Sequence, residues 1–158
     1  MNEVSILSLS TVLALGVASI SDSTFAQQRV TKDQLIGTWA LVSVSCPNPN
    51  RTPQCVDPNG LLMYDANGRY MVITAPRGRP KFTSTGDRTA HSPEEYKAVV
   101  QGFVSNFGTW SFNEVDQTVT RHEEVTFSPN FEGRDLKASI TLVGDELRTG
   151  NAVWRRVK

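Results

Sequence analysis

The chain has 158 residues, which is enough for one domain with a buried core and too few for two. Its 16 lysines and arginines balance 16 aspartates and glutamates, so the formal net charge is zero. No basic stripe is available for a phosphate backbone, and we expect no nucleic-acid partner. The sequence also lacks a nucleophile elbow, a phosphate-binding loop and a dinucleotide fingerprint, so it predicts no cofactor.

The first 26 residues differ from the rest of the chain. An uncharged run of apolar and small residues from Ile6 to Ile20 is followed by small and polar residues up to Ala26. This pattern is typical of a cleaved secretory signal, and the run is too short for a comfortable membrane span. We predict that residues 1–26 are removed and that residues 27–158 form an exported domain without a stable membrane span. An uncleaved anchor or a buried core segment stays open, because this segment carries Glu3 and no basic residue.

Leu35 to Ser45 predicts the first long strand. The segment is apolar, rich in β-branched residues and free of proline. Gly37 can lie where backbones crowd, and Trp39, two residues later, points to the same face of the strand.

Cys46 and Cys55 flank a segment with three prolines and two asparagines, which predicts a loop. In an oxidising compartment the two cysteines can form a disulfide, worth roughly 2.7 kcal/mol in the chain-entropy model. Two cysteines are too few for a zinc site, and His91 and His122 are the only histidines, so no metal is expected. The disulfide prediction agrees with export.

The middle of the chain predicts a hairpin followed by a helix. Residues 61–64 and 69–75 are strands joined by a turn that contains Asn-Gly, a strong hairpin signal. A long polar connection covers residues 76–93 and includes His91, which we expect to be exposed. Ser92, Pro93 and Glu95 then predict a capped helix that runs to about Val104.

The remaining residues alternate strands and turns, with strands predicted over 107–112, 118–127, 134–143, 146–149 and 152–157. Together these elements predict an all-β protein with one short helix: an antiparallel up-and-down barrel of about eight strands. Such a barrel is either filled by side chains or able to hold one small ligand. The apolar stripe of the helix is expected to cover the barrel mouth.

Several short motifs carry a resemblance to a known family. They include Leu35-Ile36-Gly37-Thr38-Trp39, Gly68-Arg69-Tyr70-Met71, Phe107-Gly108-Thr109-Trp110 and Val153-Trp154-Arg155-Arg156-Val157. Their order and spacing resemble the bacterial lipocalin-like domain family, whose members are small single-domain barrels. The resemblance covers nearly all of the chain after residue 34. It implies that Trp39 plugs one end of the barrel and that an arginine of the last strand, Arg156 or Arg155, stacks on it.

One predicted strand carries a candidate functional pair. His122 and Glu124 lie two residues apart on the strand 118–127, so their side chains share one face. If that face lines the cavity, the pair can anchor a polar head group or transfer protons. The opposite face mixes apolar and charged residues, namely Val119, Arg121, Glu123, Val125 and Phe127. Alternation therefore does not decide which face is inward, and a solvated or purely structural pair stays open.

Three aromatic residues, Tyr64, Tyr70 and Trp110, are candidates for the cavity wall. They can contact a ligand there or serve only as core. The structural residues are predicted to be Trp39, Arg156, Cys46 and Cys55.

These observations support three functional hypotheses. The first is an exported lipocalin-like protein that binds a small apolar molecule in the barrel cavity. The second is a cofactor-independent isomerase, cyclase or hydrolase that uses His122 and Glu124 as acid and base. The third is a structural envelope protein with a filled barrel. A cavity lined by His122 and Glu124 favours the second, and an apolar cavity without them favours the first.

The export hypothesis predicts that the mature protein begins near Gln27. Signal peptidase cleaves after small residues such as those that end at Ala26. The check is N-terminal sequencing of exported material from an expressing bacterial host. An intact Met1 in that material would contradict the prediction.

Overall fold

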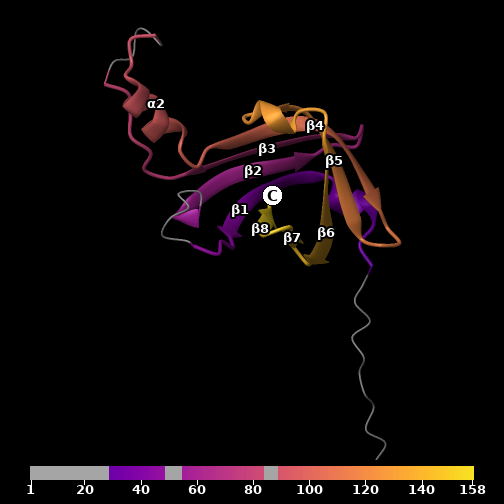
Figure 1. The fold of residues 1–158 in the computed structure, drawn as a ribbon. Helices are drawn as coiled ribbons and strands as arrows, with labels where there is room; N and C mark the ends of the chain where they lie inside the picture. Colours follow the sequence, from indigo (N-terminus) through magenta and orange to yellow (C-terminus); the bar gives the residue numbers. More distant parts are fainter. Residues whose placement is uncertain (1–28, 49–54, 84–88) are drawn as a thin grey trace, which may run out of the picture.

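The computed structural model describes residues 29–48, 55–83 and 89–158. Within them, eight strands form one closed antiparallel barrel, and each strand pairs with its neighbours in chain order (Figure 1). The last strand pairs with the first and removes both sheet edges. The prediction of an all-β, up-and-down barrel of eight strands is confirmed.

The strands are β1 (Gly37–Val44), β2 (Pro58–Tyr64), β3 (Arg69–Pro76), β4 (Val104–Asn113), β5 (Thr118–Thr126), β6 (Asp135–Val143), β7 (Glu146–Thr149) and β8 (Ala152–Arg156). The helices are α1 (Lys32–Leu35), α2 (Pro93–Val100) and the 3₁₀ helix η3 (Pro129–Phe131). The sequence analysis did not predict α1, because four residues are too few to show a helical period.

The barrel is closed by a contact between its first and last strands. Trp39 lies opposite Arg156 in the β1–β8 register, and the Arg156 guanidinium carbon lies 4.0 Å from the centroid of the Trp39 ring. The same guanidinium donates a hydrogen bond to the carbonyl oxygen of Ile36 at 3.0 Å. A Cβ atom added to Gly37 would lie 3.0 Å from Nη1 of Arg156. Glycine therefore leaves the space that the arginine occupies, and the stacking expected from the resemblance is present.

The N-terminal residues cover this closed end of the barrel. Leu35 and Val30 are buried and join Trp39 in the core, and the Trp39 indole N–H donates to the Leu35 carbonyl oxygen at 2.9 Å. Gln117, in the turn between β4 and β5, accepts a hydrogen bond from the Val30 N–H at 2.8 Å and donates one to the Val30 carbonyl at 3.0 Å. These contacts seal the end of the barrel that Trp39 occupies.

The core consists of side chains that point into the barrel from all strands. Its buried members on the strands are Trp39, Leu62, Tyr64, Tyr70, Val72, Trp110, Val119, Ile140, Leu147 and Trp154. Burial of these side chains is the main stabilising contribution of the fold.

The predicted disulfide is present between Cys46, just after β1, and Cys55, just before β2. Their Cα atoms are 6.3 Å apart, and the described residues contain no free cysteine. The bridge links the two ends of the loop that joins β1 to β2. The loop's central residues 49–54 lie outside the described part of the chain.

Helix α2 begins as predicted and ends earlier. The Ser92 hydroxyl accepts from the Glu95 N–H at 3.2 Å, while the Glu95 carboxylate accepts from the Ser92 N–H at 3.0 Å, which completes the capping box. The helix ends at Val100 rather than about Val104, because Gly102 adopts a positive φ of 77° and turns the chain into β4.

The expectation that α2 covers the barrel mouth is wrong. None of its residues is buried, and Figure 1 shows it on an arm that stands away from the barrel. Its apolar side packs locally: Tyr96 lies edge-on to Phe82 and to His91. His91 stacks on Phe82 with ring centroids 4.0 Å apart, and its side chain is only 5% exposed. His91 is therefore buried within the arm, where the sequence predicted an exposed residue.

Replacement of Trp39 by alanine tests the closure contact. Trp39 is fully buried, so Trp39→Ala should lower the free energy of unfolding by about 3–5 kcal/mol, the usual cost of truncating a buried aromatic side chain. Denaturant unfolding followed by circular dichroism measures it. The control is Val115→Ala, an exposed apolar residue, which should change stability by less than about 0.5 kcal/mol. A loss below about 1 kcal/mol for Trp39→Ala would contradict its role as a plug.

Candidate functional site

The open end of the barrel, opposite Trp39, contains a pocket of about 250 Å³. Its apolar wall is formed by side chains of four strands: Leu41, Val44, Val72, Val104 and Trp154. Its polar residues are Thr74, Asn106, Arg121, Thr149 and Asn151, and the Asn151 side-chain amide donates to the Ser45 carbonyl. A second pocket of about 260 Å³, between β4, β5 and η3, shares Val104 and Asn106 with the first.

Strand β5 supplies the charged residues of the interior. Val119 and Glu123 are fully buried, and Arg121 between them is partly buried and lines the mouth pocket. The face of β5 that the sequence left undecided is therefore inward at these three positions.

A β-bulge next to Gly108 ends this regular alternation along β5. The β4–β5 register passes from Gly108 opposite Glu123 to Phe107 opposite Val125, so Glu124 is the extra residue of β5. A Cβ atom at Gly108 would lie 1.9 Å from the carbonyl oxygen of His122, which excludes every other residue without movement of the backbone. Glycine at this position allows β4 and β5 to approach each other.

The same glycine separates two polar residues of the interior. Tyr70 lies opposite Gly108 on one side and Glu123 lies opposite it on the other. Because Gly108 has no side chain, Tyr70 and Glu123 face the space between them. Burial raises the pKa of the Tyr70 phenol, and the neighbouring Glu123 carboxylate raises it further. Tyr70 therefore stays neutral at physiological pH and can donate a hydrogen bond.

Glu123 is held by a single hydrogen bond among the described residues. The side-chain amide of Asn106 donates to its Oε2 at 2.7 Å, and its Oε1 is buried without a partner. The pKa of Tyr64 is also raised, mainly by burial. The nearby charge of Arg121 opposes this shift, and the nearby charge of Glu123 adds to it. The four residues Tyr64, Tyr70, Arg121 and Glu123 thus form one electrostatic group inside the barrel.

The positive charge of Arg121 has no ion-pair partner among the described residues. Its guanidinium carbon lies 5.8 Å from the centroid of the Tyr70 ring, and its buried Nε atom has no hydrogen-bond partner. None of the ion pairs between described residues includes Arg121. Two further groups of the same pocket, the Thr149 hydroxyl and the Trp154 indole N–H, are also buried without partners in the described part of the chain.

The structure places His122 and Glu124 on the outer surface of the barrel. His122 Nδ1 lies 2.8 Å from an oxygen of Asp135, and Glu124 forms a two-bond ion pair with Arg69 at 2.6 and 2.8 Å. The arginine hydrogen bonds lower the pKa of Glu124. The two residues share a face, as predicted, but that face is turned away from the pocket, so their suggested ligand role has no support in the interior.

The predicted aromatic wall residues are all buried inside the barrel, at different depths. Tyr64 and Trp110 pack together with ring centroids 4.6 Å apart, and the Trp110 indole N–H donates to the Asp65 carbonyl at 3.0 Å. Trp110 therefore belongs to the filled, closed half of the barrel. Tyr70 lies nearer the pocket, beneath Arg121.

Sequence reasoning missed Arg121, Glu123 and Asn106 as the interior polar residues. A signal was present in Asn106, Gly108 and Trp110, which alternate along β4 and point to one side. The pairing of β4 with β5 was needed to extend that side across the sheet.

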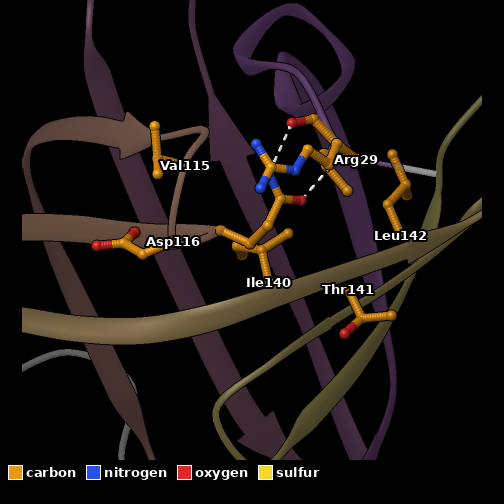
Figure 2. A pocket seen from close by; sticks show the side chains of 8 residues that line it. Arg29, Val115, Asp116, Ile140, Thr141 and Leu142 are labelled. Atoms are coloured by element: carbon orange, nitrogen blue, oxygen red, sulfur yellow. Dashed lines mark hydrogen bonds between the residues drawn. The ribbon is translucent and has the colours of Figure 1, made fainter. Parts of the chain in front are cut away.

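A third pocket, of about 320 Å³, lies at the closed end between the N-terminal segment and β6 (Figure 2). Figure 2 shows Arg29 on one side and Ile140, Thr141 and Leu142 on another, with Val115 and Asp116 from the β4–β5 turn. Gln117 and Val30, which also line this pocket, are joined by two hydrogen bonds. The Asp116 and Gln117 side chains of this pocket therefore already have partners among the described residues.

Comparison with known proteins agrees with this barrel. Residues 36–156 match a family model described as a lipocalin-like domain. The chain belongs to the lipocalin-like domain family. No curated protein sequence matches this lipocalin-like chain. A crystal structure of a lipoprotein YedD from Klebsiella pneumoniae is similar over 78% of this chain and 72% of that chain, with a TM-score of 0.42 and 8% identity.

Two further observations concern the described residues of this lipocalin-like protein. They contain no group of three or more histidine, cysteine, aspartate or glutamate side chains able to hold a metal ion. No helix among them is long and apolar enough to cross a membrane.

The inward position of Glu123 can be tested through its one partner. Asn106→Leu removes the donor and leaves a buried carboxylate without a hydrogen bond, so stability should fall by about 1–3 kcal/mol. The matched control is His122→Gln on the outer surface, which should change stability by less than about 0.5 kcal/mol. Denaturant unfolding measures both variants. Equal effects would contradict the assignment of the two faces of β5.

Proposed function

We propose that this lipocalin-like protein is exported and binds a small, largely apolar molecule in the open end of its barrel. The observation that carries the proposal is the mouth pocket, whose apolar wall surrounds buried polar groups that lack partners among the described residues. Ligand sites typically combine such a wall with a few polar groups that fix orientation.

The size of the pocket limits the ligand. The closed half of the barrel is filled by Trp39, Leu62, Tyr64, Trp110 and Leu147. The remaining space of about 250 Å³ lies just below the usual range for drug-sized ligands. A molecule with one short chain or one ring system fits this space better than a large polycyclic compound.

The disulfide and the N-terminal sequence support export. Cys46 and Cys55 are bridged, and structural disulfides persist in oxidising compartments. The apolar segment before Ala26 has the composition of a secretory signal.

The enzymatic alternative depended on His122 and Glu124 in the cavity. Both lie on the outer surface and are engaged by Asp135 and Arg69. The hypothesis of a filled barrel with only a structural role accounts for the closed half. It does not account for the unpartnered polar groups at the mouth.

The proposal predicts saturable binding of an apolar fluorescent probe such as N-phenylnaphthylamine. We expect micromolar affinity, which corresponds to about −8 kcal/mol, because the pocket is small and only part of the probe can be buried. Thr74→Phe should fill the mouth and weaken binding by about tenfold or more. The control is Thr109→Phe, which places the same side chain on the outer surface of β4.

Thr74→Phe also separates the interior from a larger apolar groove on the outer surface, which Leu61, Met63, Met71 and Ile73 help to line. Probe binding that Thr74→Phe leaves unchanged would assign the probe to that groove and overturn the proposal. Absence of binding would favour the filled barrel.

A further inference from the structure

We infer that Arg121 binds the carboxylate head group of an amphiphilic ligand whose apolar tail occupies the mouth pocket. This inference rests on the proposed function, because it names the chemical class of the molecule held there. It follows from the charge, the hydrogen-bonding capacity and the position of the polar groups in the pocket.

The charge of the pocket comes from Arg121. A guanidinium is permanently protonated and offers five N–H donors and no acceptor. The buried Nε of Arg121 has no partner, and no described carboxylate forms an ion pair with it. A charge in an apolar wall is costly unless it is paired, so an anionic ligand stabilises the site more than a neutral one.

Glu123 does not provide that pairing. Its carboxylate is fully buried, is bound by the Asn106 amide at 2.7 Å, and lines the second pocket rather than the mouth pocket. A ligand in the mouth pocket therefore contacts Arg121, and no acidic side chain lines that pocket.

The other polar groups of the mouth pocket favour an acceptor as well. The Trp154 indole N–H can only donate, and the Thr149 hydroxyl can donate; both are buried and unpartnered in the described part of the chain. Among these groups the Asn106 side-chain carbonyl oxygen can only accept, and the Thr149 hydroxyl can accept as well as donate. Two carboxylate oxygens match several convergent donors, and the planar guanidinium can bind both of them at once.

The wall of the mouth pocket sets the direction of the ligand's apolar tail. Arg121 lies near the middle of β5, whereas Val44, Thr74 and Val104 lie at the ends of their strands around the opening. A head group on Arg121 therefore directs an aliphatic chain along Leu41 and Val104 toward solvent.

The test compares two ligands that differ only in the head group, decanoate and decanol, by isothermal titration calorimetry. The wild-type protein should bind decanoate about tenfold or more tightly than decanol, the size of a charge-assisted hydrogen bond. Arg121→Gln should remove this preference and leave decanol affinity within about threefold. His122→Gln, the neighbouring residue on the outer surface, should change neither affinity.

The outcomes separate the inference from the function on which it rests. If neither ligand nor the fluorescent probe binds, the proposed function fails. If decanol and decanoate bind wild-type protein equally, or if Arg121→Gln keeps the preference for decanoate, the pocket stands and the role of Arg121 is wrong.

A second measurement covers the case in which Arg121→Gln does not fold. Carboxyl-carbon NMR of labelled decanoate bound to the wild-type protein should show a carboxyl pKa below its value in free solution, because a nearby cation favours the charged form. Arg121→Lys keeps the cation and should retain a lowered pKa. An unshifted carboxyl pKa in the wild-type complex would overturn the inference.

Discussion

The barrel depends on the contact between Arg156 and Trp39. A sheet of eight strands has two edges with unpaired backbone groups, and pairing β8 with β1 removes both. Arg156 reinforces this pairing at one end, since it stacks on Trp39 and donates to the carbonyl of Ile36. Gly37 is required in the same place, because a side chain there would meet the guanidinium. Closure at this end leaves the other end as the place where the interior retains space.

Gly108 beside the site, like Gly37 at the closed end, leaves space that a side chain would fill. It lets β4 and β5 approach so closely that any Cβ would collide with the backbone of His122. Regular alternation along β5 turns Arg121 and Glu123 inward and His122 outward, and the bulge beside Gly108 leaves Glu124 on the outer side. Two glycines thus leave the space in which Arg156 stacks at the closed end and in which β4 and β5 meet beside the site.

Much of the fold could be predicted from sequence, because its signals are local. Turn residues delimit the strands, and Ser92 and Glu95 mark a helix start. The position of Trp39 at the closed end came instead from the resemblance to lipocalin-like barrels. The inward face of β5 could not be predicted in the same way. Both faces carry charged residues, so the two-residue period gives the same pattern for either choice. Only the pairing of β5 with Gly108 and Trp110 of β4 decides between them.

The arm that carries α2 shows a different limit of sequence reasoning. Its apolar residues predicted packing on the barrel mouth, yet Tyr96 and His91 find a partner in Phe82, within the same segment. An apolar stripe predicts that one face of a helix packs against other apolar side chains. The spacing of its residues does not identify which segment supplies them. The mouth therefore stays uncovered by this helix, and the residues that line it come from the barrel strands.

Volume alone does not identify the interior pocket as a site. The groove on the outer surface is larger, at about 550 Å³, and also has arginines at its border. Those arginines are already engaged: Arg77 donates to Asp57 and Asn59, and Arg79 donates to the Val99 carbonyl. The mouth pocket differs because its donors have no partners among the described residues, and burial without partners lowers stability. A barrel with only a structural role gains stability from apolar side chains at such positions. The unpartnered donors of Arg121, Thr149 and Trp154 at the open end are therefore best explained by a molecule that supplies the missing acceptors.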